Sequence, residues 1–478
     1  MDIWYSKRLG LFLLVHAHAN VMESIFEKEF EGFDSYPSLT QDLEVEVAIV
    51  GGGLAGLLCA YHLQKAGHKV AVFEMNKIAK ATTARSTAVL TGLQNPMYTR
   101  LIKKSRVAGD YFRAQKEALL SYKEIIAEHN IDCDFEIKPA YLYAPTNSAS
   151  SASKTIKKLK KEYETMQSLG DDIASDIKWV DSEFGPAIKL EEQAQFNVLK
   201  FLQGLPKDFD IYEDTRIVDF ILKDKLLKTQ KGYTIKADKI IIATRFPAII
   251  SEVYPFKMYQ AKSYCIAFKH EPLEATYNGA EDTSLYMRSY GDYLILGGFD
   301  HRAGRHKKNI NYYDKLKTAA QELFGVDEND IAAAWSAMDT VTYDGVPFAG
   351  SVSKNHRDVY LITGFNEWGM LNGMICSRII ASAIDQKQDE FYKVFSTYRP
   401  YCAKNIDSLV PHLLIAVGSL VKGLFQGKKR CGHIGCGLRY NKIENVYECP
   451  CHGSRYDANG KLLDGPATKC VEIKKKIN

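Results

Sequence analysis

Four residues near the C-terminus have the types and the spacing of a metal or cluster site. They form a C-x-H pair and a C-x-x-H pair with fifteen residues between them: Cys431, His433, Cys449 and His452. Two such pairs on separate loops can hold two iron ions, with the thiolates on one iron and the imidazoles on the other. The same ligands could instead hold a structural zinc ion. Zinc does not account for the further cysteines at positions 436 and 451, so we favour a [2Fe-2S] cluster.

A second candidate site is the glycine-rich turn within residues 47–74. Gly51, Gly53 and Gly56 have G-x-G-x-x-G spacing. In a dinucleotide-binding turn the first glycine makes the turn, the second lets backbone approach a pyrophosphate, and the third lets helix pack on strand. Glu74 ends the next predicted strand and could accept hydrogen bonds from a ribose. An ordinary glycine-rich α/β turn is the alternative. The flanking pattern favours the dinucleotide site, with strands at 47–50 and 69–73 and a helix at 54–66.

Three further stretches could complete this site. The loop at 78–92 is rich in hydroxyl groups and could hold a phosphate or the edge of a flavin. A strand within 233–244 ends in Ile-Ile-Ala-Thr, as in a second crossing of a dinucleotide sheet. Another strand at 359–363 leads through a glycine-rich turn into a helix whose N-terminus would face a polarised group. The candidate cofactor contacts are Gly51, Gly53, Leu54, Ala55, Gly56, Glu74, Thr82, Thr83, Arg85, Ser86, Thr87, Thr244, Gly364, Phe365, Gly369 and Met370.

The composition limits the class of protein. The chain has 478 residues, 46% of them hydrophobic, which predicts a globular protein of two or three domains. Its net charge is +4, and the basic excess lies in residues 401–478, with 13 Lys and Arg against 6 Asp and Glu. No basic stripe with interleaved aromatic residues occurs, so nucleic acid is not an expected partner. Five of the ten cysteines are scattered singly, which predicts buried thiols rather than a disulfide scaffold.

The ends of the chain bear on targeting. Residues 1–19 mimic a signal peptide, but the apolar core is at the lower limit of length. We therefore expect a dispensable extension, with Met22 as an alternative start, and a cytoplasmic protein. No run of about 18 apolar residues occurs, so no transmembrane segment is predicted. The nearest candidate, residues 413–421, is expected to pack on the protein or to lie at an interface.

Residues 44–400 resemble the D-amino-acid oxidase-like flavoproteins, relatives of glycine and sarcosine oxidases. The resemblance is carried by the glycine fingerprint, the Ile-Ala-Thr strand, Asp-Gly-Val-Pro at 344–347 and Gly-Phe-x-x-x-Gly-Met at 364–370. It implies noncovalently bound FAD and an α/β fold, in which a Rossmann-like FAD-binding domain carries an inserted antiparallel β substrate domain. The chain has no second G-x-G-x-x-G for a nicotinamide cofactor, which agrees with this implication.

The C-terminal cluster resembles Rieske proteins of the cytochrome bc1 kind, through its Cys-Pro-Cys-His-Gly-Ser run at 449–454 and Gly-Pro-Ala at 465–467. The resemblance implies that Cys431 and Cys449 bind one iron and that His433 and His452 bind the other. It further implies a disulfide between Cys436 and Cys451, and hydroxyls of Ser454 and Tyr456 that donate to the cluster and a ligand sulfur. Too few residues precede Cys431 for the full β-sandwich base of such a domain. The cluster loops are therefore expected to rest on the flavoprotein body or on the preceding helix.

Together the two resemblances predict a division of the chain into five parts. These are an N-terminal extension at 1–43, an FAD-binding domain at 44–95, 171–250 and 335–400, a substrate domain at 96–170 and 251–334, a linker helix at 401–430, and a truncated Rieske domain at 431–478.

The combination resembles a known family of Rieske-containing FAD-dependent oxidoreductases. The predicted reaction is the oxidation of a small amine, amino acid or related substrate by hydride transfer to the flavin, followed by one-electron transfer to the cluster. In one alternative a ferredoxin-like donor reduces the cluster and the flavin reduces a substrate. In another the chain is a non-enzymatic electron-transfer or redox-sensing module, without a closed pocket over the flavin. A Rieske oxygenase is disfavoured, because its cluster domain normally precedes a mononuclear iron site.

The sequence singles out no catalytic base. Arg288 and Tyr286 on a predicted β-face, and His301 in the loop beyond it, are the candidate substrate contacts. A structural role is at least as plausible for Arg288 and Tyr286. The expected partners are a small-molecule substrate and either a redox protein or a quinone-type acceptor.

Overall fold

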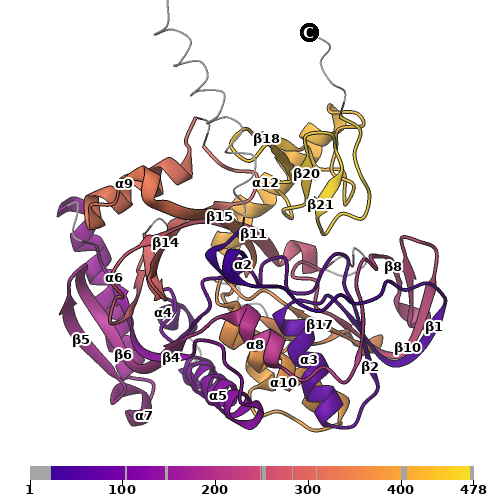
Figure 1. Ribbon diagram of the computed structural model, residues 1–478, viewed down its shortest axis with the longest axis horizontal. Coiled ribbons are helices and arrows are strands. Elements are labelled where there is room, and N and C mark those ends of the chain that lie inside the picture. Colours follow the sequence, from indigo (N-terminus) through magenta and orange to yellow (C-terminus); the bar gives the residue numbers. More distant parts are fainter. Residues whose placement is uncertain are drawn as a thin grey trace, which may run out of the picture.

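The computed structural model describes residues 23–102, 105–145, 149–247, 249, 254–281, 284–307, 309–399 and 406–473. These residues form two large sheets with helices around them, and a small third sheet at the C-terminal end of the chain (Figure 1). The candidate signal peptide lies outside the described residues. Among the described helices, none has the length and apolar character needed to cross a bilayer.

The first sheet is the parallel core of the dinucleotide fold. Its strands run in the order β16-β17-β10-β1-β2-β7, all parallel except β16, with the β8–β9 hairpin beside β10. Successive residues of a strand face opposite sides. Val47 and Ile49 therefore pack with the helices on one side, and Ala48 and Val50 join the core under the hairpin. The strands are β1 (Leu43–Val50), β2 (Val70–Phe73), β7 (Asp210–Tyr212), β8 (Ile217–Ile221), β9 (Leu226–Thr229), β10 (Thr234–Ile242), β16 (Phe348–Ser353) and β17 (His356–Thr363).

The second sheet is largely antiparallel and stands beside the first (Figure 1). Its order is β15-β11-β14-β13-β12-β4-β6-β3, with β5 paired to β6, and only β12 and β4 pair in parallel. The strands are β3 (Val89–Leu90), β4 (Glu136–Tyr143), β5 (Ile177–Ser182), β6 (Gly185–Gln195), β11 (Met258–Lys269), β12 (Thr276–Gly279), β13 (Tyr286–Tyr290), β14 (Tyr293–Arg302) and β15 (Ile331–Thr342).

Helices surround both sheets, and local signals set their ends. In α9, for example, the Asn311 side chain accepts a hydrogen bond from the Tyr313 N–H at the N-terminus, and Gly325 ends the helix with φ of +66°. The α-helices are α2 (Ile25–Glu29), α3 (Leu54–Lys65), α4 (Tyr98–Leu101), α5 (Ser105–His129), α6 (Ala149–Gln167), α7 (Asp171–Ala174), α8 (Val198–Gly204), α9 (Tyr312–Phe324), α10 (Gly369–Ile384), α11 (Tyr392–Phe395) and α12 (Ile406–Leu424). Short 3-10 turns lie at Leu222–Asp224, Tyr254–Phe256 and Glu328–Asp330.

The sheets divide the chain differently from the predicted domain boundaries. Strands β5, β6 and β15 belong to the second sheet, although the sequence interpretation placed residues 171–195 and 335–342 in the FAD-binding domain. Their ladders with β4 and β11 decide this, and backbone pairing leaves no composition signal. Part of the predicted extension also belongs to the body, because Phe26 is fully buried and the Ser24 hydroxyl donates to the Ala84 carbonyl at 2.6 Å.

The C-terminal module, residues 406–473, consists of α12 and four short antiparallel strands. They are β18 (Arg439–Asn441), β19 (Val446–Glu448), β20 (Arg455–Asp457) and β21 (Leu462–Asp464). Both expected supports are used, since the cysteine loops contact α12 on one side and the body on the other. On the body side, the Arg302 guanidinium on β14 donates to the Pro450 carbonyl at 2.8 Å and to the Cys451 carbonyl at 3.1 Å.

A buried group of charges holds the module on the second sheet. The Lys262 ammonium on β11 is completely buried and lies 2.6 Å from a Glu448 oxygen and 2.5 Å from a Glu444 oxygen. Arg455 adds a second cation 2.9 Å from Glu444. Burial would raise the pKa of Glu444, but the charges of Lys262 and Arg455 outweigh it and lower this pKa to about 2. The carboxylates of the module are therefore matched to a cation of the body.

We predict that Lys262→Met loosens the module. The substitution leaves two carboxylates of the module buried without their opposing lysine, which costs about 3–5 kcal/mol. Limited proteolysis should cleave the variant faster around α12, while exposed Lys461→Met should match the wild type. In the wild type the pKa of Glu444 is lowered from 4.5 to about 2 by folding. This carboxylate therefore contributes its full stability above pH 4.5, and the contribution is lost as the pH falls from there to about 2. If the protease cleaved the Lys262→Met variant and the wild type equally fast at pH 7, Lys262 would not hold the module in place.

Candidate functional site

The turn after β1 brings helix α3 against the strand more closely than a side chain would allow. Gly51 has φ of +113°, in the region that favours glycine. A Cβ at Gly56 would lie 1.9 Å from the Gly51 carbonyl oxygen, so a hydrogen is all that fits there. Gly53 precedes α3 as its N-cap and lines a cavity. The positive end of the α3 dipole is therefore directed at that cavity.

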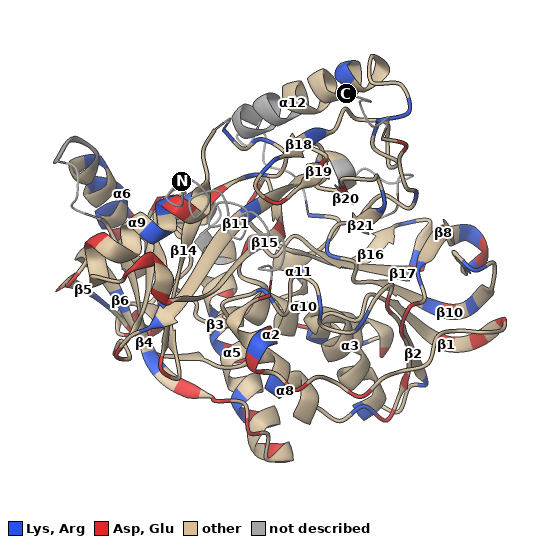
Figure 2. Ribbon diagram, turned by 45° about the horizontal axis from the view of Figure 1, so that its top comes forward, with Lys and Arg blue, Asp and Glu red and all other residues tan. Residues whose placement is uncertain are grey.

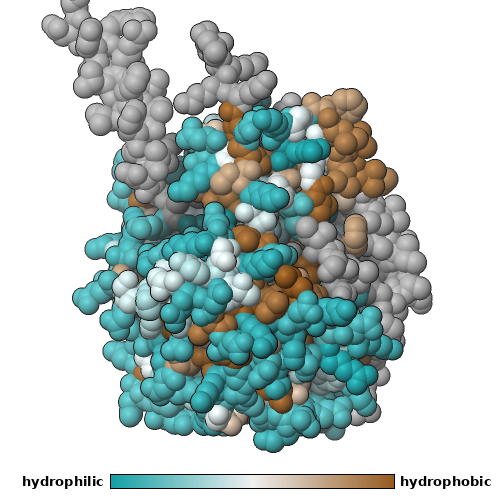
Figure 3. All heavy atoms as spheres, turned by 90° about the vertical axis from the view of Figure 1, so that its right-hand side faces the viewer, coloured by the Kyte–Doolittle hydropathy of each residue, from teal (hydrophilic) through white to brown (hydrophobic). Residues whose placement is uncertain are grey.

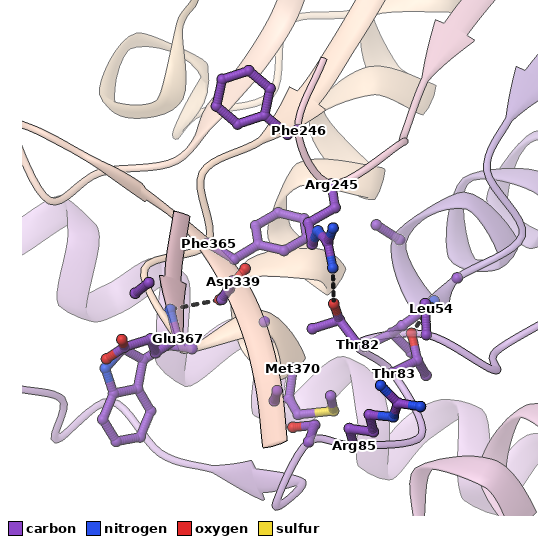
Figure 4. Close-up of a pocket in the computed structure, with 18 of the residues that line it drawn as sticks. Leu54, Thr82, Thr83, Arg85, Arg245, Phe246, Asp339, Phe365, Glu367 and Met370 are labelled. Atoms are coloured by element: carbon purple, nitrogen blue, oxygen red, sulfur yellow. Dashed lines mark hydrogen bonds between the residues drawn. The ribbon is translucent and has the colours of Figure 1, made fainter. Parts of the chain in front are cut away.

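The cavity, of about 300 Å³, lies at the carboxyl ends of the parallel strands and extends to the second sheet. Gly56 is the one predicted cofactor contact that does not line it, since it packs beneath the turn. Figure 4 shows the lining converging from α3, the 82–85 loop and the segment before α10. The other predicted contacts all line the cavity: Gly51, Gly53, Leu54, Ala55, Glu74, Thr82, Thr83, Arg85, Ser86, Thr87, Thr244, Gly364, Phe365, Gly369 and Met370.

Two hydroxyls of the predicted phosphate loop already have protein partners. The Thr83 hydroxyl accepts a hydrogen bond from the Leu54 N–H at 3.0 Å, at the start of α3. The Thr82 hydroxyl donates to the Met338 carbonyl at 2.8 Å and accepts from the Arg245 guanidinium at 3.2 Å (Figure 4). These hydroxyls therefore fix the loop between the helix and the second sheet.

Glu74 is held at the edge of the cavity by backbone. Its carboxylate accepts hydrogen bonds from the Gly52 N–H at 2.8 Å and from the Asn76 N–H at 2.9 Å. Burial raises the pKa of Glu74, and these two hydrogen bonds oppose the rise. The side chain is thus positioned next to the glycine turn, as the ribose interpretation requires.

Two of the charged residues that line the cavity, Arg245 and Asp339, were not among the predicted site residues. Arg245 directly follows the predicted Thr244, and its guanidinium lies 2.8 Å from a carboxylate oxygen of Asp464 in the module. Asp339 on β15 accepts a hydrogen bond from the Glu367 N–H at 2.6 Å (Figure 4). Burial raises the pKa of Asp339 to about 6, against its hydrogen bonds and the charge of Arg245. The available signal for Asp339 was a single carboxylate within an apolar strand.

The second sheet supplies an aromatic and amide wall to the same cavity. Tyr141 and Tyr277 stack at 5.0 Å, and the Asn278 amide donates to Asn95 at 2.9 Å. Tyr286 lines the cavity as well, and its ring lies flat across Gly297, where a Cβ would come within 2.1 Å of it. This wall can contact a small organic molecule.

Of the other two candidate substrate contacts, Arg288 also lines the cavity. The Nε and Nη1 atoms of Arg288 donate to the carbonyls of four residues, and its side chain is 1% exposed, which supports a structural role. His301 does not line the cavity and stacks with Tyr264 and Tyr312 instead. Its neighbour Asp300 lines the cavity, because successive residues of β14 face opposite ways.

The two cysteine–histidine loops meet in the C-terminal module. The Nδ1 atoms of His433 and His452 lie 3.2 Å apart. Two nitrogens bound to one tetrahedral ion at about 2.1 Å would be separated by about 3.4 Å, so this pair fits one iron. The Tyr456 hydroxyl donates to the Cys431 sulfur at 3.5 Å, and the Ser454 hydroxyl accepts from the Ala467 N–H at 3.0 Å. A disulfide joins Cys436 to Cys451. The donor set thus suits a cluster with two thiolate and two imidazole ligands.

The module also forms part of the cavity wall. Residues 464–468, which run from the last residue of β21 into the following loop, line the cavity together with the glycine turn. Phe246 lines the cavity and is 1% exposed, and its ring centroid lies 4.7 Å from that of His452 and 6.5 Å from that of His433. One buried aromatic ring therefore separates the cavity from both histidines.

We predict that Gly56→Ala damages the nucleotide site. The added methyl group collides with the Gly51 carbonyl, and overpacking of this kind costs about 1–3 kcal/mol or more. Purified protein should have a lower Tm and should retain less flavin, as measured from its visible absorbance. Gly373→Ala on α10 is the matched control, because a Cβ there meets atoms at 3.6 Å or more. That control should retain flavin, and equal retention by Gly56→Ala would refute the packing role.

Family models match both the larger N-terminal part of the chain and the C-terminal module. The family model "FAD dependent oxidoreductase" (DAO) matches residues 46–383, and the model "Rieske [2Fe-2S] domain" matches residues 419–475. A Rieske 2Fe-2S iron-sulfur protein of Bacillus subtilis, YhfW, is 29% identical over 91% of this chain and 94% of its own length. The cytochrome b6-f complex iron-sulfur subunit of Prochlorococcus marinus is 51% identical over 57 residues, which are 12% of this chain and 32% of that protein.

Solved structures share the fold of the larger part. Glycine oxidase from Geobacillus kaustophilus has a TM-score of 0.59 at 19% identity, covering 75% of this chain and all of that one. L-proline dehydrogenase from P. horikoshii has a TM-score of 0.61 at 17% identity, covering 75% and 98%. With the family match over most of the chain, these findings establish that the protein belongs to the DAO family of FAD-dependent oxidoreductases and carries a C-terminal Rieske [2Fe-2S] domain.

Proposed function

We propose that this oxidoreductase removes a hydride from a small amine, amino acid or related substrate and passes the electrons singly to its own Rieske domain. FAD, when bound, accepts hydride and releases electrons one at a time, and a Rieske cluster takes up one electron. The observation that carries the proposal is the shared wall, because residues of the Rieske domain and of the dinucleotide turn line one cavity.

The cavity can hold both parts of such a reaction. On the first sheet the α3 N-terminus, with Arg85 and Arg245, gives positive potential where a pyrophosphate would lie. On the second sheet, Tyr141, Tyr277 and Asn278 provide an apolar face with hydrogen-bonding groups for a small substrate. A non-enzymatic electron-transfer module would not need this second wall.

Asp339 is the proposed acid–base group. It lines the cavity wall, where it is half-buried, and its carboxylate is oriented by the Glu367 N–H. With a pKa raised to about 6, it can exchange a proton near neutral pH, which suits it to take a proton from a substrate ammonium group. The names of the structural neighbours, which include an L-amino acid deaminase from Proteus vulgaris, support the amine and amino acid class.

Phe246 is the proposed contact between the two redox sites. Its side chain lines the cavity and also contacts His452, with the two rings tilted by 39° at 4.7 Å. Both side chains are buried, so this ring contact lies inside the protein. The proposal further assigns the next acceptor to a redox protein or a quinone-type molecule and places the protein in the cytoplasm.

An anaerobic titration tests the direction of electron flow. We expect a member of a panel of amines and amino acids to bleach the flavin absorbance of the holoprotein, followed by the electron paramagnetic resonance signal of a reduced cluster. If every compound leaves the flavin oxidised, while a reduced ferredoxin-like donor reduces first the cluster and then the flavin, electrons flow in the opposite direction.

The role of Phe246 has a separate readout. Phe246→Leu should slow the appearance of the reduced-cluster signal and leave the rate of flavin bleaching by substrate unchanged. Phe348→Leu, another fully buried phenylalanine in the first sheet, controls for loss of packing. Equal slowing of cluster reduction in both variants would show that Phe246 acts through packing alone.

A further inference from the structure

Helix α12 is apolar on two different faces. On the first, Ala416 and Leu420 pack against the core of the Rieske domain. The Ser419 carbonyl accepts a hydrogen bond from the Gly437 N–H at 2.7 Å. A Cβ at Gly423 would lie 1.9 Å from the Gly435 carbonyl oxygen, so the helix touches the first cysteine loop directly. Packing on the Rieske domain therefore accounts for the small and apolar residues on this face of α12.

The second face is apolar and open. Its residues follow at intervals of three, four, three and one, which places them on one side of a helix. Figure 3 shows an apolar area at the upper right of the molecule, where this helix lies. The exposed fractions are 68% for Leu414, 56% for Val417, 49% for Val421, 73% for Leu424 and 85% for Phe425. No other group of large apolar residues is exposed together in this way within the described part of the chain.

Cations border the open face. Lys422 is exposed beside it, and Lys428 and Arg430 are exposed in the loop that follows the helix. Figure 2 shows basic positions at this end of α12 and in that loop. Glu472 pairs with Lys428 at 2.9 Å. The border of the apolar face therefore has an excess of positive charge.

We propose that this face binds peripherally to the surface of an anionic lipid bilayer, with α12 lying parallel to the membrane plane. The five apolar side chains would enter the boundary between headgroups and acyl chains, and the bordering lysines and arginine would meet lipid phosphates. A second copy of the chain fits this face less well. A symmetric pair uses the same patch on both copies, so the bordering cations of both, Lys422 and Arg430 among them, would be brought into one interface.

The proposed membrane-binding face lies close to the cysteine–histidine loops of the Rieske domain. The Cys451 sulfur lies 3.9 Å from the Ala416 carbonyl, on the inner face of α12. The second cysteine loop is thus separated from the proposed membrane by the thickness of one helix, about 10 Å. The proposal concerns binding alone and does not depend on the substrate or on the direction of electron flow.

Sedimentation with lipid vesicles tests the proposal on the full-length holoprotein. We expect the protein to bind vesicles of phosphatidylcholine mixed with phosphatidylglycerol, to bind phosphatidylcholine alone much more weakly, and to be released from the mixed vesicles by salt. Removing one bordering cation with Lys422→Gln should weaken binding to the mixed vesicles by about fivefold.

Substitution of two exposed leucines distinguishes insertion of the α12 face into the bilayer from nonspecific hydrophobic binding. Leu424→Gln should lower binding to the mixed vesicles at least tenfold, whereas Leu120→Gln, on the 49%-exposed Leu120 of α5, should not change it. Both side chains are exposed, so Tm and the flavin and cluster spectra should match those of the wild type. Failure of the wild type to bind the mixed vesicles, or equal binding by Leu424→Gln, would overturn the proposal. So would self-association of the wild type that Leu424→Gln abolishes, because the face would then be an interface between copies.

Discussion

The placement of the Rieske domain depends on burying a single ammonium group between two carboxylates. Lys262 comes from β11, the strand next to the edge of the second sheet, and Glu444 and Glu448 come from the module. Buried charges are tolerated when each has its partner, so the low-energy arrangement is the docked one. The guanidinium of Arg302, bound to the carbonyls of the second cysteine loop, fixes the same arrangement from a neighbouring strand. A domain held in this way stays at one distance from the cavity, so the proposed electron transfer needs no swing of the domain.

The cavity brings together three kinds of control over chemistry. Close backbone packing at Gly51 and Gly56 fixes the helix dipole, and hydroxyls of the 82–83 loop fix the edge of the site. Burial adjusts the proton affinity of Asp339. Arg245 joins the last two to the Rieske domain, since it contacts Thr82, lies near Asp339 and pairs with Asp464. Its guanidinium thus joins the nucleotide loop to the module.

The sequence predicted those parts of the structure in which the local backbone conformation or ligand spacing requires a particular residue type. The glycine spacing, the strand ends at Thr244 and Gly364, and the cysteine–histidine loops are of this kind, and nearly all the predicted cofactor contacts line the cavity. The placement of those contacts on a bound FAD stays a prediction. Local patterns carry no information on what faces a strand from another domain, so Phe246 and Asp339 were missed. The same limit explains Arg288, whose partners are carbonyls far away in sequence.

The loop at residues 464–468 has a consequence for assembly of the holoprotein. It belongs to the C-terminal module, yet it closes one side of the cavity that the predicted FAD contacts line. The open route for a large nucleotide is therefore widest before the module docks. Docking of the module on the body would then close the cavity over the bound FAD. Retention of the flavin and integrity of the iron–sulfur domain become linked properties, and a chain that fails to build its cluster would also hold its nucleotide less firmly.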